Sequence, residues 1–420
     1  MNKRRIFLKD AGLVFFAMGL GGVPGFLKQV AARAVPLRPG RKKKVLVFLF
    51  QRGAMDGLMA VSPFTDTHLR SARPGLFMEA TKQAGQAGLA DLDGRFGLHP
   101  SFSGFLPLFK EGRLAIVHGM GSPNTTRSHF DAQDYMESGT PFSKGTDSGW
   151  LNRVSGMLGA DASPLRAVSL TAAMPRSLYG DNDALAISGL QDLAIGRSGN
   201  PSGSAMAARS FEELYDHTTS ELLNKTGKES FDAMKMLGKN DLKNYRPAPG
   251  VNYPESALGR SLLQIAQLIK LDLGLQVAFA ESGGWDTHFN QGTANGIFAR
   301  NAADFSKSVL AFWNDLGSWQ EEVCVLSSTE FGRTVKQNGS GGTDHGRASC
   351  AFVIGNNIRG GKVLGEIGSL APDQLADGRD LPVTTDFRSL FSGVAAGHLG
   401  LRDSGKLFPG WEGDAMNLMR

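Results

Sequence analysis

This 420-residue chain contains four clusters of acids, histidines and hydroxyl residues, and each cluster follows an apolar run that is typical of a buried strand. Side chains of these types bind divalent cations and act as nucleophiles. The carboxyl ends of strands in open α/β sheets are where ligand and catalytic groups usually collect. The pattern therefore predicts one site at the edge of a sheet, to which all four clusters contribute.

The metal-binding prediction starts from the stretch GGWDTHFNQ, which follows an apolar run at 274–282. Asp286 and His288 are two residues apart, so both side chains leave an extended segment from the same face and can reach one cation. A surface turn with an incidental histidine is the alternative interpretation. Glu330, which comes after the run at 322–328, would join the same edge.

Two further clusters are expected to supply metal ligands. Asp56 follows the run at 44–50 and lies among glycines that let the backbone turn tightly. Asp344 and His345 are adjacent, so they cannot point the same way in a strand: one is expected to bind metal while the other serves a neighbour or a second ion. The alternative is that this pair closes a turn. Carboxylates together with imidazoles predict one or two divalent ions of Zn²⁺, Mn²⁺ or Mg²⁺.

Hydroxyls and arginines complete the predicted site. Ser128 begins an expected helix, where it would act as an N-cap, and a helix N-terminus also stabilises an alkoxide or anion. Ser128 is therefore a candidate nucleophile as well as a cap. His129 is a candidate substrate-binding residue, with metal ligand, base and helix-surface residue as alternatives. Arg52 is a candidate for binding substrate and Arg333 for catalysis, because guanidinium groups suit phosphate or sulfate, although structural ion pairing explains each equally well.

The elements that must position these residues form an alternating pattern. The apolar runs are continuous, as expected of strands covered on both faces, and segments such as 257–271 and 298–316 have apolar residues at helical spacing between them. This pattern predicts a single doubly wound α/β domain over 35–420, with a mostly parallel sheet sandwiched by helices. A polar segment at about 190–257 is predicted to be an insertion or cap.

Residues 1–34 are predicted to be a twin-arginine signal peptide. Arg4 and Arg5 precede the sequence FLK, a run of small and apolar residues, and an A-x-A cleavage site that ends at Ala34. Glycines and a proline interrupt the apolar run, which argues against a stable transmembrane segment. We therefore expect export to the periplasm, with the twin-arginine translocase as a partner.

Charge and cysteine content narrow the class of protein further. Residues 1–34 hold six of the 45 Lys and Arg residues but one of the 40 Asp and Glu residues, which leaves 39 of each in the remainder. A balanced charge argues against a nucleic-acid partner. Cys324 and Cys350 lie in apolar runs, so we expect buried thiols, or a disulfide if the two strands adjoin.

The motifs FLFQRGAMDGL, SHFDAQDYMESG, GGWDTHFNQ and SSTEFGRTVKQNGSGGTDHG, in this order, resemble those of the exported family called domain of unknown function 1501. That family is distantly similar to the alkaline phosphatase and sulfatase superfamily. The resemblance implies an alkaline-phosphatase-like sandwich with two metal ions at the strand ends. By order along the chain, the resemblance implies that Asp56 is the acid after the first strand and that Ser128 or Thr126 is the nucleophile. It further implies that Asp286 and His288 bind the first metal, that Glu330 is the acid after the next strand, and that His345 is the final histidine.

The resemblance also implies a function. It suggests a metal-dependent periplasmic hydrolase of phosphate or sulfate esters, with an anionic small molecule or a glycan or lipid ester as partner. The chain departs from the superfamily pattern at Glu330-Phe331, where an Asp-His pair is usual, and it has no cysteine at the nucleophile position of sulfatases. The alternative hypothesis is a non-catalytic, metal-stabilised binding or assembly protein with the same fold.

Export provides the first testable prediction. The double substitution Arg4→Lys and Arg5→Lys should abolish export, because the twin-arginine pair is the feature by which that route is recognised. Immunoblots of periplasmic and cytoplasmic fractions measure the effect, and N-terminal sequencing of the exported protein should begin near Val35. Unchanged export of the double variant would show that the signal has been misread.

Overall fold

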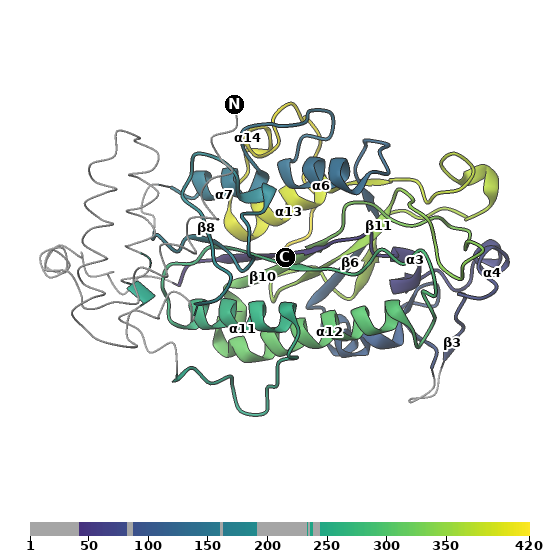
Figure 1. The fold of residues 1–420 in the computed structure, drawn as a ribbon, viewed down its shortest axis with the longest axis horizontal. Helices are drawn as coiled ribbons and strands as arrows, with labels where there is room; N and C mark the ends of the chain where they lie inside the picture. The colour runs from purple at the N-terminus through teal and green to yellow at the C-terminus, as the bar shows by residue number, and fades with distance from the viewer. Residues whose placement is uncertain (1–41, 82–86, 160–162, 191–232, 234–235, 238–243) are drawn as a thin grey trace, which may run out of the picture.

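The computed structural model describes residues 42–420 apart from 82–86, 160–162, 191–232, 234–235 and 238–243 (Figure 1). The predicted signal peptide and most of the predicted insertion lie outside the described residues. The dominant element is a nine-stranded sheet with the order β12-β6-β11-β10-β1-β9-β7-β8, and β13 pairs with β6 beside this path. Its strands are β1 Val45–Gln51, β6 Leu114–Gly121, β7 Ala167–Ser169, β8 Leu185–Ala186, β9 Val277–Ser282, β10 Val323–Ser328, β11 Ser349–Ile354, β12 Lys362–Leu364 and β13 Thr385–Asp386.

The remaining elements surround this sheet. A small four-stranded sheet has the order β2-β5-β4-β3, with strands Val61–Ser62, Gly97–Leu98, Leu89–Asp91 and Ala80–Thr81. The α-helices are α3 Gly57–Ala60, α4 Thr67–Ala72, α5 Leu106–Lys110, α6 His129–Ser138, α7 Trp150–Met157, α11 Ala257–Lys270, α12 Ile297–Leu316, α13 Phe387–Leu399 and α14 Ser404–Leu407. Among the described residues, no helix is both long and apolar enough to cross a membrane.

The large sheet lies between two layers of helices. Helices α6, α7, α13 and α14 cover one face, and α11 and α12 cover the other (Figure 1). Strand β1 has apolar side chains on both faces of the sheet, so each face needs a covering layer. Leu46, Phe48 and Phe50 pack into one hydrophobic core, while Val47 and Leu49 pack into the other. A continuous apolar run is what a strand buried on both faces requires. The predicted α/β class, with a mostly parallel sheet between helices, is confirmed.

Strand direction brings four loops to one edge of the sheet. Strand β1 is parallel to both β9 and β10, with Phe50 opposite Glu281 on one side and Ser328 on the other. Strand β11 is antiparallel to both of its neighbours, β10 and β6. Strand β6 therefore runs in the same direction as β1. The loops that follow β1, β6, β9 and β10 leave from one edge, and the chain that enters β11 starts from that same edge.

The two cysteines remain free and buried. Their strands adjoin, but Cys324 packs into the core on the α13 side and Cys350 into the core on the α12 side. Side chains on opposite faces of a sheet cannot form a disulfide. Burial raises the pKa of Cys324 to about 12, so this thiol is unreactive.

Asp315 of α12 fixes the chain that enters α11. This buried carboxylate accepts hydrogen bonds from the Tyr245 hydroxyl at 2.6 Å, the Tyr253 hydroxyl at 2.9 Å, the Ala248 amide at 2.7 Å and the Lys270 ammonium at 2.8 Å. The described end of the predicted insertion is thereby tied to both helices of this layer.

Loss of this carboxylate should destabilise the protein. Asp315→Ala should lower the free energy of unfolding by about 3 kcal/mol, because three polar groups and an ammonium lose a buried partner. Urea denaturation followed by circular dichroism measures this change. The neighbouring exposed residue provides the control, since Asn314→Ala should change stability by less than about 0.5 kcal/mol. Equal effects of the two substitutions would contradict the assignment.

Candidate metal centre

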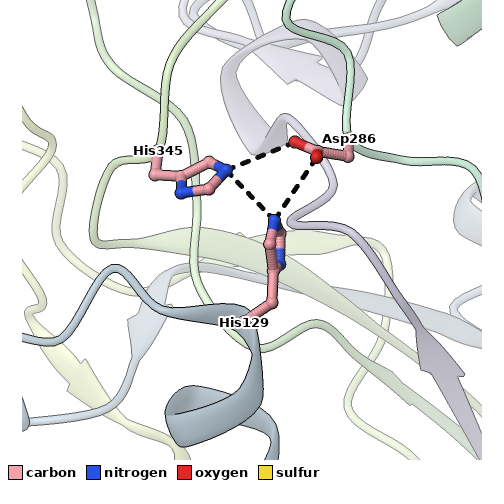
Figure 2. Close-up of side chains that lie close together, drawn as sticks. All are labelled: His129, Asp286 and His345. Carbon is pink, nitrogen blue, oxygen red and sulfur yellow. Dashed lines mark hydrogen bonds and ion pairs between the residues drawn. The ribbon is translucent and has the colours of Figure 1, made fainter.

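Three side chains from separate parts of the chain converge at the carboxyl edge of the sheet: His129, Asp286 and His345 (Figure 2). The Nε2 atoms of the two histidines are 3.0 Å apart. The Asp286 carboxylate lies 3.3 Å from His345 Nε2 through Oδ1 and 3.5 Å from His129 Nε2 through Oδ2. Donors arranged tetrahedrally around a zinc ion are about 3.3 Å from one another. The donor atoms of the three residues therefore have the spacing that a single ion requires.

His288 adds a fourth donor beside this group. Its Nε2 lies 2.9 Å from His345 Nε2 and 3.1 Å from Asp286 Oδ1. The imidazole rings of His288 and His345 are 4.6 Å apart between centroids. Asp286 and His288 thus reach the same place, as their spacing predicted.

Each imidazole is held through its other nitrogen by an oxygen acceptor. His129 Nδ1 donates to Glu330 Oε1 at 2.8 Å, and His345 Nδ1 donates to the carbonyl oxygen of Arg127 at 2.8 Å. His288 Nδ1 lies 3.1 Å from Asp344 Oδ1. A neutral imidazole carries one N–H, so these bonds leave a lone pair on every Nε2 atom.

The lone pairs carry a chemical consequence. Two nitrogen lone pairs that face each other at 3.0 Å repel unless a proton or a metal ion lies between them. Metal-binding histidines typically have Nδ1 fixed by a carboxylate or backbone carbonyl in this way. The donor set and its supporting oxygens therefore fit a divalent cation.

The local fold explains how each residue reaches the centre. His129 is the first residue of α6, just after β6, and Asp286 and His288 follow β9. His345 reaches the same edge because the antiparallel strand β11 starts there. Gly342 allows this loop to approach closely, since a Cβ at this position would lie 2.3 Å from the carbonyl oxygen of His288.

The pKa values of the three residues are shifted in different directions by their surroundings. The hydrogen bond to Glu330 raises the pKa of His129, whereas burial lowers the pKa of His345. At Asp286, burial acts to raise the pKa but is outweighed by the hydrogen bond and charge of Arg333, so the carboxyl pKa is lowered. Asp286 is therefore ionised, and a site that favours a proton on His129 also favours a metal ion in its place.

Arg333 was predicted to be catalytic, but in the structure its guanidinium contacts only protein groups. Its guanidinium is buried and donates to the backbone oxygens of Gly53, Ala54, Trp285 and Thr343, and to Asp286 Oδ1 at 2.5 Å. A guanidinium has five N–H donors, and these contacts with four carbonyl oxygens and a carboxylate leave few of them for a substrate. It positions Asp286.

Asp56 was predicted to bind metal, but the structure gives it a different role. The buried carboxylate receives a two-pronged ion pair from Arg73, at 2.8 and 3.2 Å, and a hydrogen bond from Gln291 at 2.7 Å. It also accepts the amide of Met59 as the N-cap of α3. Both oxygens are thus used in supporting the loops beneath the site.

Glu330 and Asp344 support histidines where metal ligation was expected. The buried Glu330 carboxylate accepts from His129, from the Gly53 amide at 2.9 Å and from Gln133 at 2.9 Å. Asp344 accepts from His288 and from Asn338 at 3.1 Å. Their carboxylates orient imidazoles, and His345 of the Asp344-His345 pair faces the centre.

Arg52 is held by carboxylates rather than left open for substrate. It lies 2.5 Å from Glu281 and 2.9 Å from both Glu137 and the Gln133 side-chain oxygen. Although burial acts to lower it, the pKa of Arg52 is raised by the charges of Glu137 and Glu281. The structure therefore favours the ion-pair alternative at this position.

The two candidate nucleophiles lie in the turn before α6. Ser128 is exposed and is the N-cap residue, but its side chain makes no capping hydrogen bond. Asp131, the acid that would complete a capping box, instead pairs with Lys144 at 2.5 Å. Thr126 Oγ1 accepts the Ser128 amide at 3.2 Å and lines a small hollow beside Glu330 and Phe331. Ser128 thus keeps its hydroxyl available next to His129.

Three supporting residues were not anticipated from the sequence: Arg73, Arg127 and Gln133. Gln133 had a usable signal, because a side chain four residues after His129 lies on the same face of a helix. It joins Glu330 to Arg52. Arg127 contributes a backbone oxygen and Arg73 pairs with a distant acid, and sequence patterns give no signal for either contact.

The fold and this centre together define an α/β protein with a histidine and carboxylate site at the carboxyl edge of a mostly parallel sheet. Residues 43–409 match the family described as a protein of unknown function (DUF1501), so the chain belongs to this family. No curated protein matches the chain.

Metal content tests the assignment of the centre. His129→Ala, Asp286→Asn and His345→Ala should each weaken zinc binding by at least about a hundredfold, because a lost ligand cannot be replaced from a rigid strand end. Elemental analysis and competition with a chromophoric chelator measure this change. The exposed His68 provides the control, and His68→Ala should bind zinc as the wild type does. Full zinc occupancy in all three site variants would rule out the centre.

Proposed function

We propose that this protein is a metal-dependent hydrolase of phosphate or sulfate esters, with one divalent ion bound by His129, Asp286 and His345. The observation that carries the proposal is the convergence of imidazole lone pairs, each fixed by an oxygen on the opposite nitrogen. The expected alkaline-phosphatase-like relationship and the periplasmic location belong to the same proposal.

Zinc is the ion that these donors suit best. Imidazole nitrogens favour zinc and other transition metals, whereas Mg²⁺ prefers a shell of oxygens and retains water. Two or three histidines with one carboxylate therefore narrow the expected choice of Zn²⁺, Mn²⁺ or Mg²⁺ towards zinc. A second ion would need its own ligands, and the carboxylates of Asp56 and Glu330 are already used in contacts with protein groups.

The chain supplies the attacking group and its environment. A bound zinc ion provides Lewis acidity that stabilises negative charge on oxygen. Ser128 offers its hydroxyl at the N-terminus of α6, where the backbone N–H groups and the helix dipole favour an anionic oxygen or a bound phosphate. Arg333 and Glu330 keep Asp286 and His129 in place during the reaction.

One observation favours a second candidate function. Arg52 and Arg333, the two guanidiniums expected to hold an anionic substrate, are engaged in ion pairs and backbone contacts. A metal-stabilised binding or assembly protein needs the ion but not a substrate-binding arginine. Such a protein would bind zinc without hydrolysing esters, which distinguishes it from the proposed hydrolase.

Hydrolysis should be measured with zinc-loaded protein against a panel of phosphate and sulfate monoesters. We expect zinc-dependent turnover, and Ser128→Ala should lower kcat on the order of a thousandfold because the attacking oxygen is lost. The neighbouring exposed Thr125 is the matched control, and Thr125→Ala should keep wild-type kcat. A protein that holds its zinc but hydrolyses none of the esters would overturn the catalytic proposal in favour of the binding protein.

A further inference from the structure

Exposed aromatic residues follow two of the histidines of the candidate metal centre. In the described part of the chain, four large hydrophobic side chains are exposed: Phe130 at 89%, Phe142 at 72%, Phe289 at 64% and Tyr179 at 37%. Phe130 directly follows His129, and Phe289 directly follows His288. Two of the four thus lie next to histidines that meet at one point.

Phe142 belongs to the same region. The segment around it is tied by two contacts to the turn before α6 and to the first turn of α6: the Pro141 oxygen accepts from Asn124 at 2.7 Å, and Lys144 pairs with Asp131 at 2.5 Å. Phe142 lies between these two tethers in the sequence. It is therefore held close to the N-terminal end of α6, where Phe130 also lies.

We infer that Phe130, Phe142 and Phe289, here called the aromatic rim, bind the hydrocarbon part of an amphiphilic phosphate or sulfate ester whose charged end reaches the metal centre. This inference rests on the proposed function, because it names the class of substrate for that site. It also assigns a role to rings that leave large apolar surfaces in water.

The chemistry of the rings favours hydrocarbon over other occupants. Phenylalanine has no hydrogen-bonding group, whereas a sugar needs partners for its hydroxyls. A protein partner is also disfavoured, because three rings offer less contact area than a stable protein interface needs. A stable interface covers about 800 Å² on each side, and each aromatic side chain contributes about 150–250 Å² even when it is completely covered. Three rings match an alkyl chain better than a protein surface.

Binding of a homologous ligand series tests the inference without requiring turnover. Methyl, butyl and octyl phosphate, each below its micelle concentration, should bind zinc-loaded protein with increasing affinity in calorimetry. Each methylene that the rings cover adds up to about fourfold in affinity. Phe130→Ser, Phe142→Ser and Phe289→Ser should each reduce this dependence on chain length while zinc content stays unchanged. Tyr179→Ser is the matched control and should preserve the full dependence.

The outcomes separate this inference from the proposed function. Chain-length dependence without hydrolysis would sustain the inference and remove the catalytic proposal. Hydrolysis with equal affinity for all three phosphates, or no loss in the three serine variants, would overturn the inference alone. The rim would instead be a membrane contact if the substitutions abolished flotation with phosphatidylcholine vesicles but left alkyl phosphate binding intact, and that result would also overturn it.

Discussion

One buried guanidinium holds together the loops that form the candidate metal centre. Arg333 is shielded from water, and a buried charge costs several kcal/mol unless it is paired and its hydrogen bonds are satisfied. It meets this requirement with backbone oxygens from the loop after β1, the loop after β9 and the loop before β11. Its carboxylate partner, Asp286, is also a candidate metal ligand. The position of the ligand and the packing of the loops thus depend on the same contact.

The sequence indicated which residue types gather at the sheet edge, but not what each one does there. Asp286, His288 and His345 were predicted because each lies near a strand end, and the strand directions bring those ends to one edge of the sheet. The roles of Asp56 and Glu330 could not be predicted, because each is decided by a partner from another loop. Arg73 forms an ion pair with Asp56, and His129 forms a hydrogen bond with Glu330. A periodic pattern reports burial and direction, while the pairing of charges depends on tertiary structure.

The fold class was predictable because continuous apolar runs and amphipathic helices alternate along the chain. The direction of β11 was harder, since a fully buried strand has the same pattern whether it is parallel or antiparallel. Parallel neighbours need a long crossover, usually a helix. The chain between β10 and β11 contains no helix and folds back along the edge. A connection without a helix indicates an antiparallel strand. Because β11 is antiparallel, it starts at the edge where His345 reaches the centre.

The separation of the ligands along the chain has a consequence for folding. The contact between His129 and His345 joins residues that are 216 positions apart, and the contact between His129 and Glu330 spans 201. Closing such loops is an entropic cost that assembly of the central sheet must meet first. A metal ion at the candidate centre would therefore not nucleate this fold. In the proposed function, an ion would bind a chain whose strands are already in register, so an occupied centre would mark a completed molecule and stabilise it against unfolding.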